Sequence, residues 1–184
     1  MKGIVFNLLE SCVSAEHGED TWDDMLEAAS LEGAYTSLGS YDDLEAFALI
    51  AAASKLLNVP AEEVERWFGR AAMGLLSERY PEFFAPHSAT CSFVLTLNEI
   101  IHPEVRKLYP GADVPDFEFD GQTAGRFSMR YRSKRQMCAF AEGLIAGAAD
   151  RYGERAEIEH PSCMKRGDEA CTLLCSFTSS DLNG

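Results

Sequence analysis

Apolar residues recur at helical spacing through most of the N-terminal part of the chain. Four stretches show this periodicity and are predicted to be helices: residues 2–15, 22–29, 44–57 and 60–79. Thr21 is a suitable cap for the second helix, and either Asp42 or Asp43 for the third. The segment 31–40 is rich in Gly, Ser and Thr and lacks the helical pattern, so it is predicted to be a loop.

A further amphipathic helix is predicted just before residue 102. Its apolar side chains stand four residues apart: Phe93, Leu97 and Ile101. Ser88 is a plausible N-cap for this helix. Pro103 disfavours the helical conformation at His102, so the helix is predicted to end there and a new turn to begin at the proline.

From Val114 onward, apolar and polar residues alternate in short runs. Runs at 117–119 and 127–131 predict two antiparallel strands that join near Asp120-Gly121. A helix is predicted from Arg135 to Tyr152, because Gly153 is suited to end it. Two more strands, at 156–160 and 170–177, flank a turn at 165–168.

These elements predict an α+β fold in a single domain, residues 1–184. A helical N-terminal lobe (1–64) precedes a second lobe (65–184), in which a four-stranded antiparallel sheet packs against helices. At 184 residues, of which 46% are hydrophobic, the chain can bury a substantial core.

Charge and cysteine content narrow the class of protein. The net charge of −14 repels phosphate backbones and anionic lipids, so neither nucleic acid nor a membrane is expected as a partner. No stretch has the length and polarity of a membrane span, and the apolar run 4–9 lacks a signal-peptide cleavage pattern. A cytoplasmic location is expected, and the six cysteines are expected to be thiols or metal ligands.

Two segments carry candidate chemistry. His102, among apolar neighbours, could be a packed core histidine or could offer a neutral ring nitrogen to a metal. Further along, in an extended chain, Tyr131, Ser133 and Arg135 point to the same side. A phenol, a hydroxyl and a guanidinium suit an anion with several oxygens, although an ordinary polar strand face has the same pattern.

Together these segments resemble the heme nitric oxide/oxygen-binding (H-NOX) family. In that family Glu and Val follow the axial histidine by two and three residues, as here, and a Y-x-S-x-R motif holds the heme propionates. The likeness extends over nearly the whole chain, through residues 1–9, Trp22, 35–39, 66–69 and 108–112. It implies heme b between the two lobes, with His102 as proximal iron ligand and Tyr131, Ser133 and Arg135 as propionate partners.

The predicted helix after Arg135 bears on the ligand. One of its faces is made of small residues: Ala139, Gly143 and Gly147. A second helix or the plane of a macrocycle could approach this face. The resemblance places the neighbouring Phe140 and Leu144 in the heme pocket, and Pro115 against the macrocycle. Oxygen-binding members carry a distal tyrosine where this chain has Phe140, whereas nitric oxide and carbon monoxide bind ferrous iron well in an apolar cavity.

The resemblance therefore implies a non-enzymatic nitric oxide sensor that also binds carbon monoxide. Binding of the gas would weaken the bond from iron to His102, relax the heme against Pro115 and shift the lobes. With no kinase or cyclase segment in the chain, the output is expected in a separate protein, and the family suggests a histidine kinase or a diguanylate cyclase/phosphodiesterase. A heme enzyme would need a distal acid and base, which His17 and His87 are not placed to supply.

A second candidate metal site lies near the C-terminus. The predicted hairpin brings Cys163 and Cys171 together, with His160 on one of its strands and Cys138 arriving from the preceding helix. Three sulfurs and one imidazole suit tetrahedral zinc, although buried reduced thiols are also common in sheets. Cys175 is an alternate ligand or a partner for disulfide formation. The alternative function is a zinc and thiol redox sensor, with or without heme.

Overall fold

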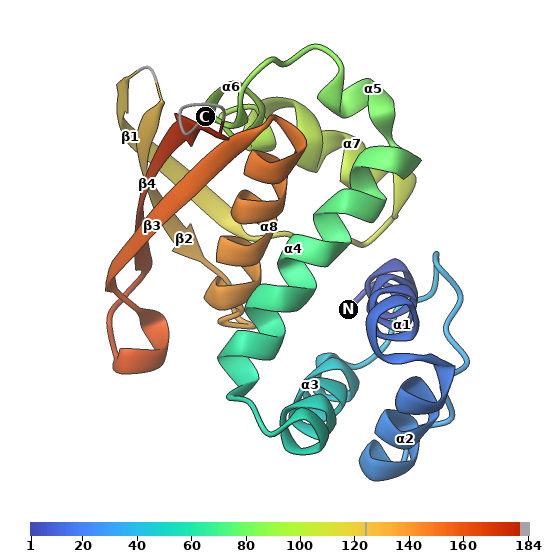
Figure 1. The fold of residues 1–184 in the computed structure, drawn as a ribbon. Helices are drawn as coiled ribbons and strands as arrows, with labels where there is room; N and C mark the ends of the chain where they lie inside the picture. Colours follow the sequence, from blue (N-terminus) through green and yellow to red (C-terminus); the bar gives the residue numbers. More distant parts are fainter. Residues whose placement is uncertain (124, 181–184) are drawn as a thin grey trace.

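The computed structural model describes residues 1–123 and 125–180, and its N-terminal lobe is helical. Helices α1 (Gly3–His17), α2 (Glu19–Ala29) and α3 (Asp43–Leu57) form this lobe, and α4 (Ala61–Arg79) runs from it into the rest of the molecule (Figure 1). Asp42 caps α3 as predicted, because its side chain accepts a hydrogen bond from the Leu44 amide. Thr21 does not cap α2, which begins one turn earlier, and its hydroxyl instead donates to the His17 carbonyl.

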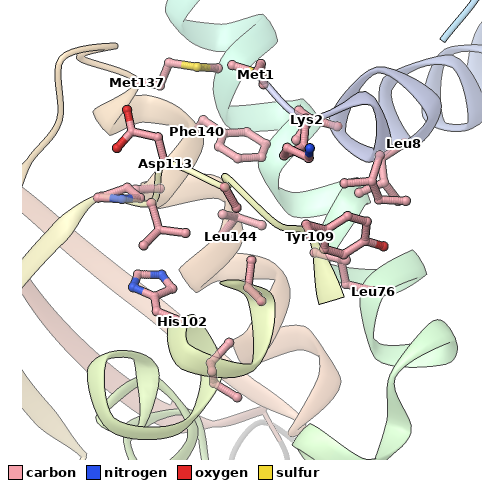
Figure 2. Close-up of a pocket in the computed structure, with 18 of the residues that line it drawn as sticks. Met1, Lys2, Leu8, Leu76, His102, Tyr109, Asp113, Met137, Phe140 and Leu144 are labelled. Atoms are coloured by element: carbon pink, nitrogen blue, oxygen red, sulfur yellow. The ribbon is translucent and has the colours of Figure 1, made fainter. Parts of the chain in front are cut away.

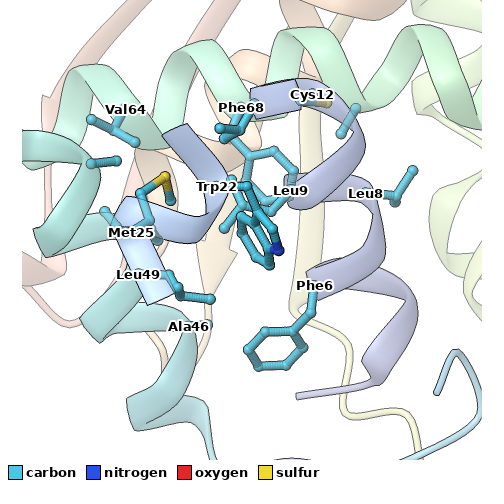
Figure 3. Close-up of a cluster of buried hydrophobic side chains, with 14 of the residues drawn as sticks. Phe6, Leu8, Leu9, Cys12, Trp22, Met25, Ala46, Leu49, Val64 and Phe68 are labelled. Carbon is cyan, nitrogen blue, oxygen red and sulfur yellow. The ribbon is translucent and has the colours of Figure 1, made fainter. Parts of the chain in front are cut away.

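Large apolar side chains from all four helices form the core of this lobe (Figure 3). Trp22 and Met25 from α2, Leu49 from α3 and Phe68 from α4 are all at most 5% exposed. Burying each such side chain contributes about 1.5–3 kcal/mol. The first half of α4 is therefore held to the N-terminal lobe by its apolar face.

The chain between α4 and the sheet departs from the prediction. It contains α5 (Pro81–Phe84), α6 (Thr90–Val94), a π-helical turn η1 (Leu97–Ile101) and α7 (His102–Leu108). The predicted single helix is thus interrupted, and Ser88 does not cap it, since α6 starts at Thr90 without a side-chain cap.

The predicted helix end at His102 is also wrong. His102 has helical backbone angles, φ −65° and ψ −39°, and the chain continues through Pro103 into α7. A proline lacks the amide hydrogen, and its ring crowds the carbonyl four residues back. The backbone widens instead of stopping, and the His102 amide donates to the carbonyl of Leu97, five residues back.

The four predicted strands form one antiparallel sheet. Strands β1 (Asp116–Thr123), β2 (Arg126–Arg132), β3 (Glu154–Ser162) and β4 (Cys171–Ser179) stand in the order β1-β2-β4-β3. Helix α8 (Cys138–Arg151) packs against one face of the sheet (Figure 1). The β1–β2 connection comes after Thr123 rather than at Asp120-Gly121, where the pairing register shifts and Gly121 has a φ of 62°.

Helices α4 and α8 cross in very close contact through glycines. A Cβ on Gly143 would lie 2.1 Å from the Arg66 carbonyl oxygen, and one on Gly147 would lie 2.5 Å from the carbonyl oxygen of Arg70. From the other side, a Cβ on Gly69 would lie 2.2 Å from the Phe140 carbonyl oxygen. The small-residue face of α8 therefore receives a helix and not a macrocycle.

Helix α4 is the element shared by both parts of the molecule. The border expected between residues 64 and 65 falls within its first turns. None of the helices described within residues 1–123 and 125–180 is by itself long and apolar enough to cross a membrane. Helices α3 and α4 meet that criterion only as a pair, bent by 106°.

Candidate functional site

A cavity of about 400 Å³ lies between the N-terminal lobe and the rest of the chain (Figure 2). Helices α1, α4, α7 and α8 and the segment before β1 contribute its walls, which are mostly apolar. This volume lies in the range of pockets that take a small ligand or cofactor. All seven residues predicted for a heme pocket line it: His102, Pro115, Tyr131, Ser133, Arg135, Phe140 and Leu144.

The His102 ring faces this cavity from the junction of η1 and α7 (Figure 2). It stacks on Phe117, with ring centroids 5.3 Å apart. Burial, helped by nearby Arg106, lowers the pKa of His102 to about 4. The imidazole is therefore neutral at physiological pH, which is the form that ligates a metal.

Tyr131, Ser133 and Arg135 reach the cavity by a route that differs from the prediction. Strand β2 ends at Arg132, so the three residues do not share a continuous strand face. The chain turns instead, and the Arg135 amide lies 3.3 Å from the Ser133 hydroxyl oxygen, to which it donates. Burial raises the pKa of Tyr131 to about 12, which keeps its phenol protonated and able to donate.

Two acidic residues anchor the Arg135 side chain. Its Nη1 donates to the Asp113 carbonyl oxygen at 2.7 Å, and its Nε lies 2.9 Å from Asp43 Oδ1. This Nε is buried and, although within ion-pair distance, makes no hydrogen bond to a described residue. A buried donor that makes no hydrogen bond, beside a phenol and a hydroxyl, fits a carboxylate ligand. The residues present thus fit a heme, with His102 for the iron and Arg135 for a propionate.

Phe140 and Leu144 form an apolar part of the cavity wall on α8 (Figure 2). The Phe140 ring packs on Phe68 with centroids 4.9 Å apart. Tyr80 and Tyr109, which no sequence motif marks as site residues, also line the cavity, and their hydroxyls are hydrogen-bonded to each other. Each satisfies the other, and only one of the two protons remains available to another acceptor.

The family model for haem-NO-binding proteins matches residues 2–160. The chain belongs to this family, the H-NOX proteins. It is 32% identical to an H-NOX protein from S. oneidensis in the Fe(II)NO ligation state, with a TM-score of 0.90 over 97% of this chain and 100% of that one. For unliganded Fe(II) H-NOX from K. algicida the values are 26% and 0.88, over 100% of both chains.

A third similar structure is the H-NOX from Shewanella woodyi in the Fe(II)CO ligation state, bound to the compound IWP-051. It is 33% identical, with a TM-score of 0.79 over 100% of this chain and 97% of that one. H-NOX domains bind heme and sense gases, and are generally not catalytic. The predicted α+β fold and the family resemblance are both confirmed.

The predicted zinc ligands of this H-NOX chain also come together. Cys138, His160, Cys163 and Cys171 each offer a ligand atom, and these atoms lie within 4.8 Å of one another. Cys163 Sγ is 3.7 Å from Cys138 Sγ and 3.9 Å from Cys171 Sγ. Thiolates about 2.3 Å from a tetrahedral zinc ion are about 3.8 Å apart, so these separations fit zinc.

The protonation chemistry of the cluster also suits a cation. Burial raises the pKa of Cys138 and of Cys171, so both thiols remain protonated unless a positive ion holds them as thiolates. His160 Nε2 is buried and has no hydrogen-bond partner among the described residues. A buried, unpartnered nitrogen beside three sulfurs is the arrangement that a zinc site requires.

Cys175, predicted as an alternate ligand, is not part of this cluster. It lies on the same face of β4 as Cys171 but four residues further along, paired with Phe127 and Ile158 in another part of the core. Its distance from Cys171 along an extended strand is about 13 Å, too far to share a metal ion. The structure therefore excludes Cys175 as a ligand to the same ion.

Three functional side chains were missed in the sequence. Asp43 and Asp113 hold Arg135, and nothing in their local sequence signals it. Glu142 contacts His160. The sequence does contain a signal for this residue, because Glu142 is the one carboxylate between Cys138 and Asp150 and stands one helical turn after Cys138. A lone acid on an otherwise small and apolar helix face, one turn from a predicted ligand, was the available clue.

Proposed function

We propose that this H-NOX chain binds nitric oxide at a ferrous heme b and regulates a separate signalling protein. The observation that carries the proposal is the position of His102, a neutral imidazole facing a cavity that Phe140 and Leu144 make apolar. Ferrous heme, when bound, supplies the iron at which nitric oxide or carbon monoxide is ligated. The solved relatives in the Fe(II)NO and Fe(II)CO states support this choice of ligands.

Different residues around the cavity are proposed to bind different parts of the heme. His102 supplies the proximal nitrogen, and Tyr131, Ser133 and Arg135 supply donors for the propionates. Phe140 offers no hydrogen bond on the distal side, which favours nitric oxide over oxygen. Because His102 is the first residue of α7, any displacement of its ring is passed directly to that helix.

The signal is proposed to pass to another protein in the cytoplasm, and the chain itself to act without catalysis. A histidine kinase or a diguanylate cyclase/phosphodiesterase is the expected partner. The net charge of −14 favours a basic contact surface on that partner. We propose that α7 and the segment before β1 shift when the gas binds, and that this shift changes the surface that the partner contacts. Such a shift requires that the gas binds one conformation of the protein more tightly than the other.

An absorption spectrum of the purified protein, reduced under argon, tests the proposal. We expect a Soret band that moves on addition of nitric oxide and, separately, of carbon monoxide. Air is expected to give no stable oxygen complex, because Phe140 offers no hydrogen bond to bound oxygen. Failure to take up heme, or a Soret band that nitric oxide leaves unchanged, would contradict the proposal.

We propose a second function, zinc and thiol redox sensing, on the evidence of the cluster formed by Cys138, His160, Cys163 and Cys171. Oxidation of two of its thiols to a disulfide by peroxide would remove two ligands and release zinc. Elemental analysis should find one zinc per chain, released by hydrogen peroxide and restored by thiol reductant with zinc. Protein purified with zinc supplied but holding none would eliminate this function.

A further inference from the structure

Glu142 is a buried carboxylate whose two oxygens have different partners. Oε1 lies 2.5 Å from His160 Nδ1, and Oε2 accepts a hydrogen bond from Arg66 Nε at 2.7 Å. Arg66 donates in addition to Glu63 at 2.6 Å. The Glu142 side chain is 9% exposed, and a buried carboxylate is costly unless it is paired and hydrogen-bonded. The chain keeps this acid inside a helix of small apolar residues, at a position that touches His160.

The contact decides which nitrogen of His160 carries the proton. A carboxylate that is paired with Arg66 accepts hydrogen bonds, so Nδ1 is the ring nitrogen of His160 that donates to it. The lone pair is then on Nε2, the buried atom without a hydrogen-bond partner in the described chain. One ring nitrogen of His160 lies within 4.8 Å of the sulfurs of Cys138, Cys163 and Cys171, and because Nδ1 is bonded to Glu142, we assign this nitrogen as Nε2.

We propose that Glu142, held by Arg66, is the positioning residue of the metal cluster. It fixes the tautomer and the ring orientation of His160, and through Arg66 it ties the cluster to α4. This inference rests on the metal site proposed above and adds two residues that are not ligands. Helix α4 also lines the heme cavity through Met73 and Leu76, so the same contact connects the cluster to a wall of that cavity.

The competing explanation is that Glu142 and Arg66 merely brace α8 against α4. The chain provides a matched control for it. Arg70 and Asp150 join the same two helices by two hydrogen bonds, of 2.5 Å and 2.7 Å, without touching the cluster. Asp150→Asn and Glu142→Gln each remove one tie between the two helices, whereas only Glu142→Gln removes the group that orients His160.

Equilibrium dialysis of the full chain against zinc buffers, with zinc measured by elemental analysis, separates these explanations. Loss of a carboxylate behind a metal-bound histidine costs about 10–100-fold in affinity, so Glu142→Gln should bind zinc weaker by that factor. Arg66→Met should weaken binding less, and Asp150→Asn should stay within about twofold of wild type.

Equal zinc affinity in wild type and Glu142→Gln would overturn the proposal, as would equal losses in Glu142→Gln and Asp150→Asn. Wild-type protein that binds no zinc would instead remove the metal site itself, a failure distinguishable from the other two.

A measurement on unaltered protein covers the case in which a variant does not fold. Proton-nitrogen correlation spectra of the zinc-loaded chain, in the diamagnetic ferrous carbonyl state, report the tautomer of each histidine. We expect His160 to be protonated on Nδ1 with zinc on Nε2. Zinc on Nδ1, or no zinc at His160, would overturn the role of Glu142.

Discussion

Tyr131 and Cys171 are paired directly across strands β2 and β4. Phe117 on β1 extends the same row, opposite Tyr131. Tyr131 lines the heme cavity and Cys171 belongs to the metal cluster, and both are at most 1% exposed. Residues opposite each other in an antiparallel sheet have Cβ atoms about 4.5–5.5 Å apart. The two candidate sites are therefore adjacent across a single sheet pairing.

This adjacency predicts that damage to the cluster reaches the heme. Cys171→Ser should lower zinc content and, because Tyr131 packs against the cluster, should speed heme loss about fivefold, the effect of roughly 1 kcal/mol of coupling. Heme transfer to an acceptor apoprotein, timed at the Soret band, measures the rate. Cys91→Ser, at a half-buried thiol outside the cluster, is the control. Equal heme loss in the two variants would show that the sites are independent.

His102→Gly should lose most of its heme. No other imidazole lines the cavity formed by the described residues, so nothing replaces the axial ligand. Removal of a residue that only supports a metal ligand lowers the metal affinity about 10–100-fold, so loss of the ligand itself should lower the heme affinity more than tenfold. The ratio of Soret to protein absorbance after gel filtration measures retention. His87→Gly should keep its heme, and equal retention in both variants would refute the assignment.

Phe140→Tyr should favour oxygen. A phenol on the distal wall adds a donor worth about 1 kcal/mol, which would slow oxygen dissociation about fivefold. Stopped-flow spectroscopy of the ferrous protein mixed with oxygen measures this rate. Phe83→Tyr, which adds a phenol to the cavity wall from α5, is the control. An unchanged rate in Phe140→Tyr would mean that residue 140 does not face the bound gas.

The sequence predicted those elements whose signals are local. Helix α3 begins where Asp42 accepts the Leu44 amide, and α4 follows Pro60, because caps and prolines act within one turn. The π-helical turn before His102 could not be read in this way. Pro103 forbids the ordinary hydrogen bond, but neighbouring packing decides whether the chain then stops or widens.

In the candidate sites too, local features were predicted from the sequence and contacts between distant elements were not. The spacing of cysteine and histidine residues was sufficient to predict that the four residues of the metal cluster come together, since they lie on one hairpin and one helix. The error on Cys175 arose because alternation assigns a face of a strand but not a position along it. Glu142 was missed because its role depends on how α8 meets β3, a contact between elements that local sequence does not specify.

Gly143→Ala should be strongly destabilising. The added methyl would lie 2.1 Å from the Arg66 carbonyl oxygen, and backbone cannot yield as a side chain does. Forcing α4 and α8 apart should cost about 3 kcal/mol in the free energy of unfolding, measured with urea. Gly74→Ala in the same α4 meets nothing within 4 Å and should stabilise by about 0.5–1 kcal/mol. A neutral Gly143→Ala would mean that the two helices pack less closely.

The ion pair between Asp43 and Arg135 should be visible as a pH-dependent stability. Burial alone would raise the pKa of Asp43, but the hydrogen bond from the Met1 ammonium and the positive charge of Arg135 outweigh it, so the pKa is lowered. A lowered carboxyl pKa contributes stability that is complete above the unfolded-state pKa of about 3.9 and disappears as pH falls through the folded-state value.

Asp43→Asn should therefore lower the free energy of unfolding by about 1 kcal/mol at pH 7, a modest figure because the side chain is 34% exposed. Urea unfolding should give the same difference at pH 5.5, and a shrinking difference below about pH 3.9. Asp24→Asn, at an exposed acid of α2, serves as control and should differ little from wild type at any pH. A difference for Asp43→Asn that persists undiminished to pH 3 would mean that the Met1 ammonium and Arg135 do not stabilise the charged form of this carboxylate.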